Sequence, residues 1–309
     1  MEIEGSELTI RDCHFDGNRA IRGGALSLQG GSSLTLSDCS FVNNTASEGG
    51  AVFLNASSLS TTRTVFAENA LSSTESAAQS AGGAVAGINQ EDFINLSFTG
   101  CTFEANRAEH SGGSVYLMGN FQTTVDDCQF LRNRAEEGGA VLVQGPETQE
   151  GRQISQYAEL NILSSTFDGN GAQMGGAISL QPGTNGSITS SRFANNAATD
   201  GGAVYLLNDA SLTVDDVRFV RNSAERGGAV YLEADSAPST EISDLSSPRV
   251  HFEMRSSECH RNQASLGGCV AAFNNTHIRI QVSEIEGNIA SSDGGGVYGF
   301  RVNDLTRSE

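Results

Sequence analysis

The 309-residue sequence contains no lysine and no tryptophan, and only four prolines. All 18 of its basic residues are therefore arginine, and 37 acidic residues bring the formal net charge to −19. Such an acidic surface repels nucleic acid and anionic membranes, so we expect neither as a partner. No apolar run approaches the ~20 residues of a transmembrane helix, and the opening residues lack the pattern of a signal peptide. We therefore expect no direct membrane insertion by this segment.

What the sequence does contain is a repeat. Its unit has an asparagine, usually three residues after a phenylalanine and two before an alanine, and each copy is followed by a glycine pair. Without an insertion, one unit spans about 26 residues, as from Phe15 to Phe41. The ten asparagines are Asn18, Asn44, Asn69, Asn106, Asn133, Asn170, Asn196, Asn222, Asn262 and Asn288.

The unit is too short and too rich in Gly, Asn, Ser and Asp for a helix, and its apolar residues alternate as in β-strands. Leu34 and Leu36 share one face of a strand, and the chain must bend near Asp38 before Phe41 can face the same side. A third strand follows the glycines. Three short strands and three corners make one rung of a parallel β-helix, so the sequence predicts an all-β solenoid of about ten rungs.

The repeated asparagine suits a corner, because Asn tolerates left-handed and bridge conformations and its amide both donates and accepts hydrogen bonds. Identical amides stacked rung on rung would form a hydrogen-bonded ladder. We therefore interpret the ten asparagines as structural rather than as a binding or catalytic site.

The segments FDGNRAIRGGALSL and FVRNSAERGGAVYL resemble the paired FxxN and GGA[ILV] repeats of the chlamydial polymorphic membrane proteins, and the resemblance covers nearly all of the chain. These are adhesin-like passenger domains of autotransporters. The resemblance implies a right-handed, pectin-lyase-like parallel β-helix that is displayed outside the cell, at the outer membrane in a bacterium. It also implies a cell-surface protein or glycan as partner.

The repeat continues without a shift in composition, so we expect residues 1–309 to form a single β-helix domain. Insertions are expected at 71–80, 145–158 and 234–249. Neither end carries an obvious cap, and the open edges of a stacked β core invite pairing. We therefore expect the segment to belong to a longer surface protein, with neighbouring domains of the same chain as further partners.

The six cysteines occupy two kinds of position. Cys13, Cys39, Cys101 and Cys128 stand two residues before a repeat phenylalanine, in a slot for a small inward residue, and free core thiols are favoured there over vertical disulfides. Cys259 and Cys269 replace the phenylalanine and the alanine of one rung, which leaves a compensating disulfide open. Counting alternation back from Ala271 turns Cys269 outward, and this favours free thiols.

Parallel β-helices often act on polysaccharides, so carbohydrate-active sites have to be considered. The candidate carboxylate pairs are Asp126–Asp127 and Asp215–Asp216, but the second member of each falls at the predicted bend, as Asp38 does. The five histidines share no repeat position and no metal-ligand spacing. We therefore expect no catalytic residue, metal or cofactor, and retain a polysaccharide lyase or glycoside hydrolase with an unrecognised acidic site as the alternative.

A partner-binding face is predicted from the third residue after each glycine pair, which should point outward. Aromatic residues recur there, as Phe53, Tyr116, Tyr205, Tyr231 and Tyr298. An aromatic ladder that merely suits a β surface is one interpretation. The other is a flat aromatic floor at Tyr205 and Tyr231, between insertions about 14 Å apart. The insertions would supply acidic walls from Glu147, Glu150, Glu241 and Asp244.

Overall fold

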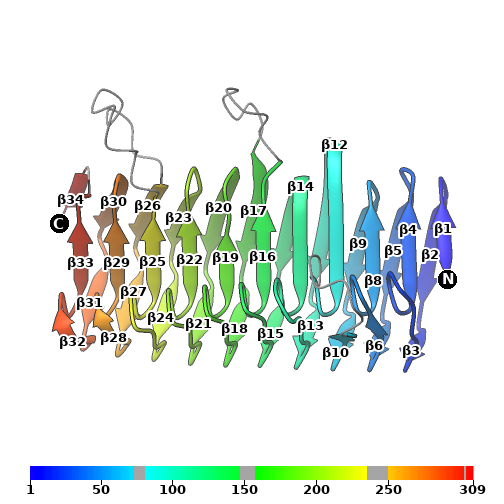
Figure 1. Ribbon diagram of the computed structural model, residues 1–309, viewed down its shortest axis with the longest axis horizontal. Coiled ribbons are helices and arrows are strands. Elements are labelled where there is room, and N and C mark those ends of the chain that lie inside the picture. Colours follow the sequence, from blue (N-terminus) through cyan, green and yellow to red (C-terminus); the bar gives the residue numbers. More distant parts are fainter. Residues whose placement is uncertain (73–80, 147–156, 235–249, 303, 309) are drawn as a thin grey trace.

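The computed structural model describes residues 1–72, 81–146, 157–234 and 250–302, and the backbone of 304–308. The chain winds into a rod whose two ends of sequence lie at opposite ends of the long axis (Figure 1). Every strand pairing is parallel and joins neighbouring rungs, as the repeat predicts. No helix in the described part is long and apolar enough to cross a membrane.

Each rung contributes one strand to each of three faces. The Phe strands, which carry the repeat phenylalanine or the Cys259 and Ile285 that replace it, form a ten-stranded sheet. They are β3 (His14–Asp16), β6 (Ser40–Val42), β10 (Val65–Ala67), β13 (Thr102–Glu104), β15 (Gln129–Leu131), β18 (Thr166–Asp168), β21 (Arg192–Ala194), β24 (Arg218–Val220), β27 (Glu258–His260) and β31 (Glu284–Glu286).

The other two faces join into one 20-stranded sheet. The Gly-Gly strands begin with β1 (Glu2–Glu4), which lies ahead of the first glycine pair. Those that follow a glycine pair are β4 (Leu26–Gln29), β8 (Val52–Asn55), β16 (Val141–Gln144), β19 (Ile178–Leu180), β22 (Val204–Leu207), β25 (Val230–Glu233), β29 (Val270–Phe273) and β33 (Val297–Phe300). The Leu strands, which precede the bend, are β2 (Glu7–Arg11), β5 (Ser33–Ser37), β9 (Ser58–Thr62), β17 (Ala158–Leu163), β20 (Thr184–Thr189), β23 (Ser211–Asp215), β26 (Val250–Arg255), β30 (Thr276–Gln281) and β34 (Asp304–Ser308).

Two long strands, β12 (Val85–Thr99) and β14 (Val115–Asp126), run through both of these faces. Short pairs lie after the asparagine corner, and they are β7 (Thr45–Ala46) with β11 (Ala70–Leu71) and β28 (Gln263–Leu266) with β32 (Ile289–Asp293).

The core is a column of apolar side chains along the rod axis. Leu34, Leu36 and Phe41 are fully buried, which confirms the predicted inward positions. Consecutive phenylalanine rings from Phe15 to Phe219 stack face to face, with centroids 4.6 to 5.2 Å apart. Stacked aromatics therefore fix the vertical register along eight rungs.

The predicted asparagine ladder is present in all ten rungs. The Oδ1 atom of Asn133 accepts hydrogen bonds from the N–H and the Nδ2 of Asn106, at 2.9 and 3.2 Å. Its own Nδ2 donates to the Oδ1 of Asn170 and to the carbonyl of Phe103, both at 3.0 Å. The pattern repeats along the rod, and only the end members Asn18 and Asn288 are not buried.

The left-handed backbone at this corner differs from the prediction. It is adopted by the residue before each ladder asparagine, such as Asn43 and Arg132, with φ near +55°. The ladder asparagine itself has an ordinary φ, so its amide makes it the corner residue, rather than its tolerance of positive φ. The predicted bend after the Leu strands is confirmed, with positive φ at Asp12, Asp38, Asp127 and Asp216. Asp127 and Asp216 thus hold corner positions, as expected.

Cys259 and Cys269 form a disulfide, so the expectation of free thiols is wrong for this pair. The N–H groups of Cys269 and Val270 both donate to the carbonyl of Gly296. Two consecutive donors to one acceptor break the strand alternation, as in a β-bulge, and turn both side chains toward the core. The other four cysteines are free as predicted; Cys13 is exposed and the remaining three are buried.

Candidate functional site

The predicted aromatic floor is not exposed, which corrects the expectation for Tyr205 and Tyr231. The two rings stack at 5.6 Å in neighbouring rungs, outside the main core as the alternation predicts, but they are only 3% and 0% exposed. Tyr116 is half-buried, and its hydroxyl contacts the sulfur of Met118. Glu147, Glu150, Glu241 and Asp244 lie outside the described residues, so the acidic walls stay a prediction.

The segment between the asparagine corner and the glycine pair covers these tyrosines. The guanidinium of Arg226 lies 4.8 Å from the centroid of the Tyr231 ring and forms an ion pair with Asp200 at 2.6 Å. The hydroxyl of Tyr205 donates to Glu233 at 3.4 Å. Burial is the main cause that raises the pKa of both tyrosines above the usual value. Neither ring is available to stack on a ligand.

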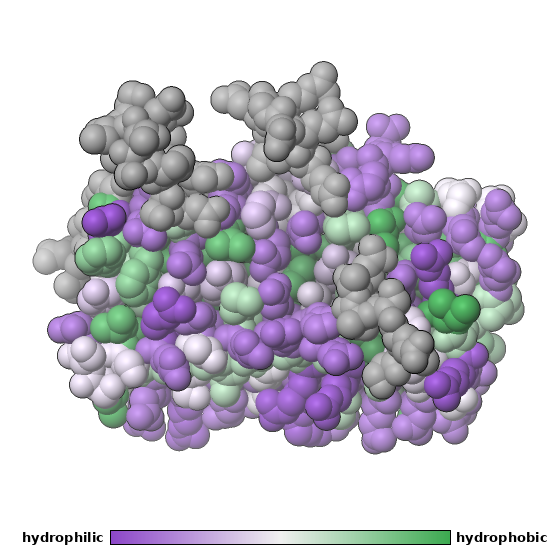
Figure 2. Space-filling view, in the orientation of Figure 1, coloured by the Kyte–Doolittle hydropathy of each residue, from purple (hydrophilic) through white to green (hydrophobic). Residues whose placement is uncertain are grey.

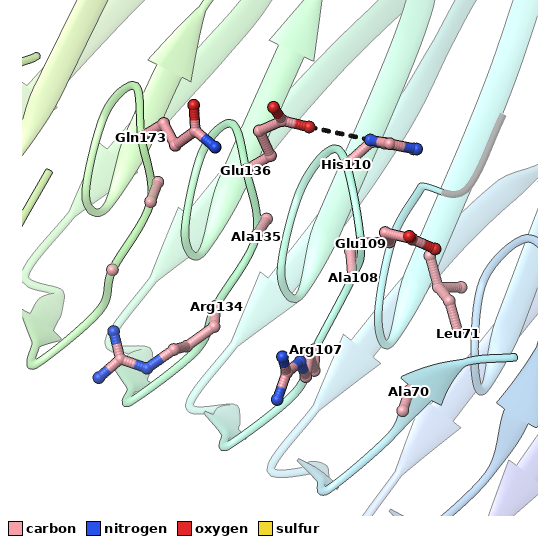
Figure 3. Close-up of a pocket in the computed structure, with 12 residues that line it drawn as sticks. Ala70, Leu71, Arg107, Ala108, Glu109, His110, Arg134, Ala135, Glu136 and Gln173 are labelled. Atoms are coloured by element: carbon pink, nitrogen blue, oxygen red, sulfur yellow. Dashed lines mark hydrogen bonds and ion pairs between the residues drawn. The ribbon is translucent and has the colours of Figure 1, made fainter. Parts of the chain in front are cut away.

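Among the described residues, one space that is open to a partner is a groove of about 720 Å³ along rungs three to six. It lies beside the asparagine corner, and the residues two positions after the ladder asparagines form its floor, which is alanine in three of these rungs and Leu71 in the first (Figure 3). We name it the alanine groove after that floor. Its lining is Ala70, Leu71, Arg107, Ala108, Glu109, His110, Arg134, Ala135, Glu136, Gly171, Ala172 and Gln173.

The two rims of the alanine groove differ in charge. Arg107 and Arg134 line one side, while Glu109, Glu136 and Gln173 project from the other (Figure 3). His110 contacts Glu136 across neighbouring rungs, with 2.9 Å between Nδ1 and Oε2. The groove can therefore offer cationic donors and anionic acceptors to one ligand at the same time.

The arginine rim is built by the register of the rungs. Ala70, Arg107, Arg134 and Gly171 pair in sequence as parallel bridges, so the two arginines stack with a small neutral residue on either side. No ion pair of either guanidinium is found within the described ranges. Glu137 follows Glu136 of the other rim in the sequence. Its pKa is raised mainly by burial and secondly by the charge of Glu136.

A second opening of about 410 Å³ lies over the Leu strands of rungs two to four. Serine, asparagine and apolar residues line it, among them Ser33, Ser58, Phe93 and Asn95. It has no carboxylate in its described lining, so it offers no acid or base for glycoside hydrolysis.

One group of side chains could hold a divalent cation. His260, Glu284 and Glu286 lie on the Phe strands β27 and β31, and one ligand atom from each falls within 4.8 Å of the others. Residue spacing along the chain does not reveal this group, so it was not predicted. The register places Glu286 opposite His260, which a rung-by-rung alignment would have shown.

The alanine groove was also missed, although the sequence carries a signal for it. Alanine recurs two residues after nearly every ladder asparagine, and arginine follows the asparagine directly in two consecutive rungs, at Arg107 and Arg134. Read as vertical columns, these positions predict a small-residue floor beside a basic edge.

Comparison with known proteins supports the fold seen here. Residues 1–148 match the family model described as "Right handed beta helix region". Searches of curated proteins and of solved structures return no match. The rungs beyond residue 148 repeat the same three faces and the same ladder. On the face of the rod shown in Figure 2, hydrophilic residues are mixed with scattered hydrophobic ones. The chain is therefore a right-handed parallel β-helix with the pectin-lyase-like fold.

Proposed function

We propose that this chain is an extracellular or cell-surface adhesion and structural module, of the chlamydial polymorphic membrane protein repeat type, that holds a protein or glycan partner. The observation that carries the proposal is the alanine groove, because it is an open, charged concavity on a rigid scaffold. Binding sites in such scaffolds usually lie where irregular segments meet regular strands.

The scaffold supports a binding role because it keeps the groove in one shape. Asn106, Asn133 and Asn170 of the ladder lie directly beneath the floor and are fully hydrogen-bonded and buried. A preformed site loses little conformational entropy when a partner binds. The groove can thus bind without rearranging the rungs that form it.

An extracellular location is supported by the disulfide between Cys259 and Cys269. Disulfides form and persist in oxidising compartments and are rare in the cytosol. The predicted adhesive role requires the same location.

The test fills the groove without changing charge. Ala135→Tyr places a ring on the floor, and we expect it to abolish binding to a glycan array or an immobilised cell surface. Ala198→Tyr is the matched control, because Ala198 holds the same repeat position and the same partial burial outside the groove lining. Equal binding by the wild type and Ala135→Tyr, with both folded by circular dichroism, would contradict the proposal.

The same protein can be tested for the alternative function, that of a carbohydrate-active enzyme. Incubation with acidic and neutral polysaccharides, with and without calcium, should give no new reducing ends and no unsaturated products. Sustained turnover would show that the chain is a carbohydrate-active enzyme instead.

A further inference from the structure

Arg107 pairs with Arg134 of the neighbouring rung, and neither guanidinium has an ion pair with an acid among the described residues. Like charges directly opposite one another on neighbouring strands are destabilising. Several described arginines have an acid in an adjacent rung, and examples are Arg22 with Glu48, Arg63 with Asp38 and Arg226 with Asp200. Arg192 and Arg218 pair with each other, but each also has an acid on its other side, Asp168 and Glu258. Arg107 and Arg134 have no such acid, since Ala70 and Gly171 flank them in the column.

The surroundings of the pair leave room for an anion. Both side chains are exposed along the alanine groove, whose floor at Ala108 and Ala135 carries no group beyond a methyl. Arg134 extends toward Gly171, where an added Cβ would overlap its Nη1 atom. The glycine therefore gives the guanidinium its place at the rim.

We propose that Arg107 and Arg134 form an oxyanion-binding site, which holds a carboxylate, sulfate or phosphate group of the partner between two guanidinium groups. Guanidinium is planar and presents paired donors that match the two oxygens of such a group. An anion between the arginines removes their mutual repulsion, and the acidic far rim at Glu109 and Glu136 confines it to the basic side. The inference rests on the proposed function only in taking the groove as the partner site.

The molecule contains its own control for a general charge effect. Arg221 and Arg261 occupy equivalent positions in consecutive rungs, immediately before Asn222 and Asn262. They are exposed and lie outside the groove lining, and no ion pair of either is found among the described residues. Two exposed arginines of consecutive rungs outside the groove are thus available for comparison with the two inside it.

The test is an NMR titration of the whole chain with inorganic phosphate, sulfate and acetate in turn, read on the arginine Nε–Hε signals. We expect saturable shifts at Arg107 and Arg134, and no saturation at Arg221 or Arg261. R107Q and R134Q should each weaken binding roughly tenfold, since each removes a charge-assisted contact. The double control R221Q/R261Q should leave the affinity unchanged.

Gly171→Ala separates geometry from charge. Gly171 does not have a positive φ, so alanine fits the backbone, but its methyl group displaces the Arg134 guanidinium. We expect weaker anion binding at unchanged net charge. A preference for acetate would identify a carboxylate-bearing partner, and a preference for sulfate or phosphate a sulfated or phosphorylated one; either supports the site.

Absence of saturation in the wild type, unchanged affinity in R107Q and R134Q, or an equal loss in R221Q/R261Q would overturn the proposal. None of these results decides whether the groove binds a partner, which the Ala135→Tyr binding assay tests separately. Conversely, the wild type could bind the anions while Ala135→Tyr still binds the partner normally. That outcome would support the oxyanion site and contradict the proposed function.

Discussion

The asparagine ladder makes a quantitative prediction at Asn133, in the middle of the rod. Asn133→Ala removes four hydrogen bonds made by one amide, two accepted from Asn106 and two donated to Phe103 and Asn170. The side-chain amide of Asn106 keeps other acceptors in Phe66 and Ser114. Its buried backbone N–H loses the acceptor that Asn133 supplies.

The expected loss of stability in Asn133→Ala follows from these contacts. A buried donor without an acceptor costs about 1–3 kcal/mol, and the remaining bonds contribute about 1 kcal/mol net. We therefore expect Asn133→Ala to lower the free energy of unfolding by about 2–4 kcal/mol. Asn18→Ala should cost less than ~1 kcal/mol, because Asn18 is exposed and its side-chain amide donates to Asn44 alone among the described residues.

The measurement is urea unfolding followed by far-ultraviolet circular dichroism, with midpoints compared at constant slope. Asn133→Asp tests the donor side separately, since it retains an acceptor for Asn106 but sets an oxygen against the carbonyl of Phe103. It should be no more stable than Asn133→Ala at neutral pH. A midpoint for Asn133→Ala equal to that of Asn18→Ala would refute the view that the ladder is a buried network.

Three further changes test other contacts. Replacing Cys259 and Cys269 together by serine should lower the free energy of unfolding by about 3 kcal/mol, as expected for a loop closed over a sequence separation of 10. Restoring the repeat residues with Cys259→Phe/Cys269→Ala should recover part of that loss. Equal urea midpoints for the wild type and the double serine variant would contradict a stabilising role of the disulfide. Tyr231→Phe should raise the free energy of unfolding by about 1 kcal/mol, because the buried hydroxyl has no hydrogen-bond partner among the described residues. Tyr205→Phe should not raise it, because that change removes the hydrogen bond to Glu233. Burial raises the pKa of Glu137, so its protonated form favours folding and that contribution is lost as pH rises through the folded pKa. Glu137→Gln should therefore raise the melting temperature at pH 7 and leave it unchanged well below pH 4.5, the ordinary value; a gain of the same size at both pH values would rule out the titration of Glu137 as the cause.

The fold could be predicted because each rung repeats the same physical constraints. Alternation fixed which side of each strand Leu34, Leu36 and Phe41 face, and stacking of identical amides fixed the ladder. Alternation also gave the direction of Tyr205 and Tyr231, but it cannot say whether a neighbouring segment lies over them. Their burial depends on Arg226 and Asp200, which come from another part of the rung.

The candidate site was harder to predict because it arises between rungs. The alanine groove exists where consecutive copies place small residues in one column and arginines in the next, and no single copy contains it. Cys269 illustrates a second limit. Its side chain turns inward because of a local break in the hydrogen-bond pattern at the start of β29, which a strict period of two does not include.

The direction of the bonds between rungs has a mechanical consequence. These bonds run along the rod axis, so tension applied to its two ends pulls each one along its own length rather than sideways. The rod should then yield one turn at a time rather than all at once, because each turn is held to its neighbours by its own set of bonds. A turn of 26 residues, such as that between Asn196 and Asn222, releases about 90 Å of extended chain. The turn held by the disulfide releases less, because the ten-residue span from Cys259 to Cys269 cannot extend. Under load the molecule is an extensible tether whose length increases in steps of one turn.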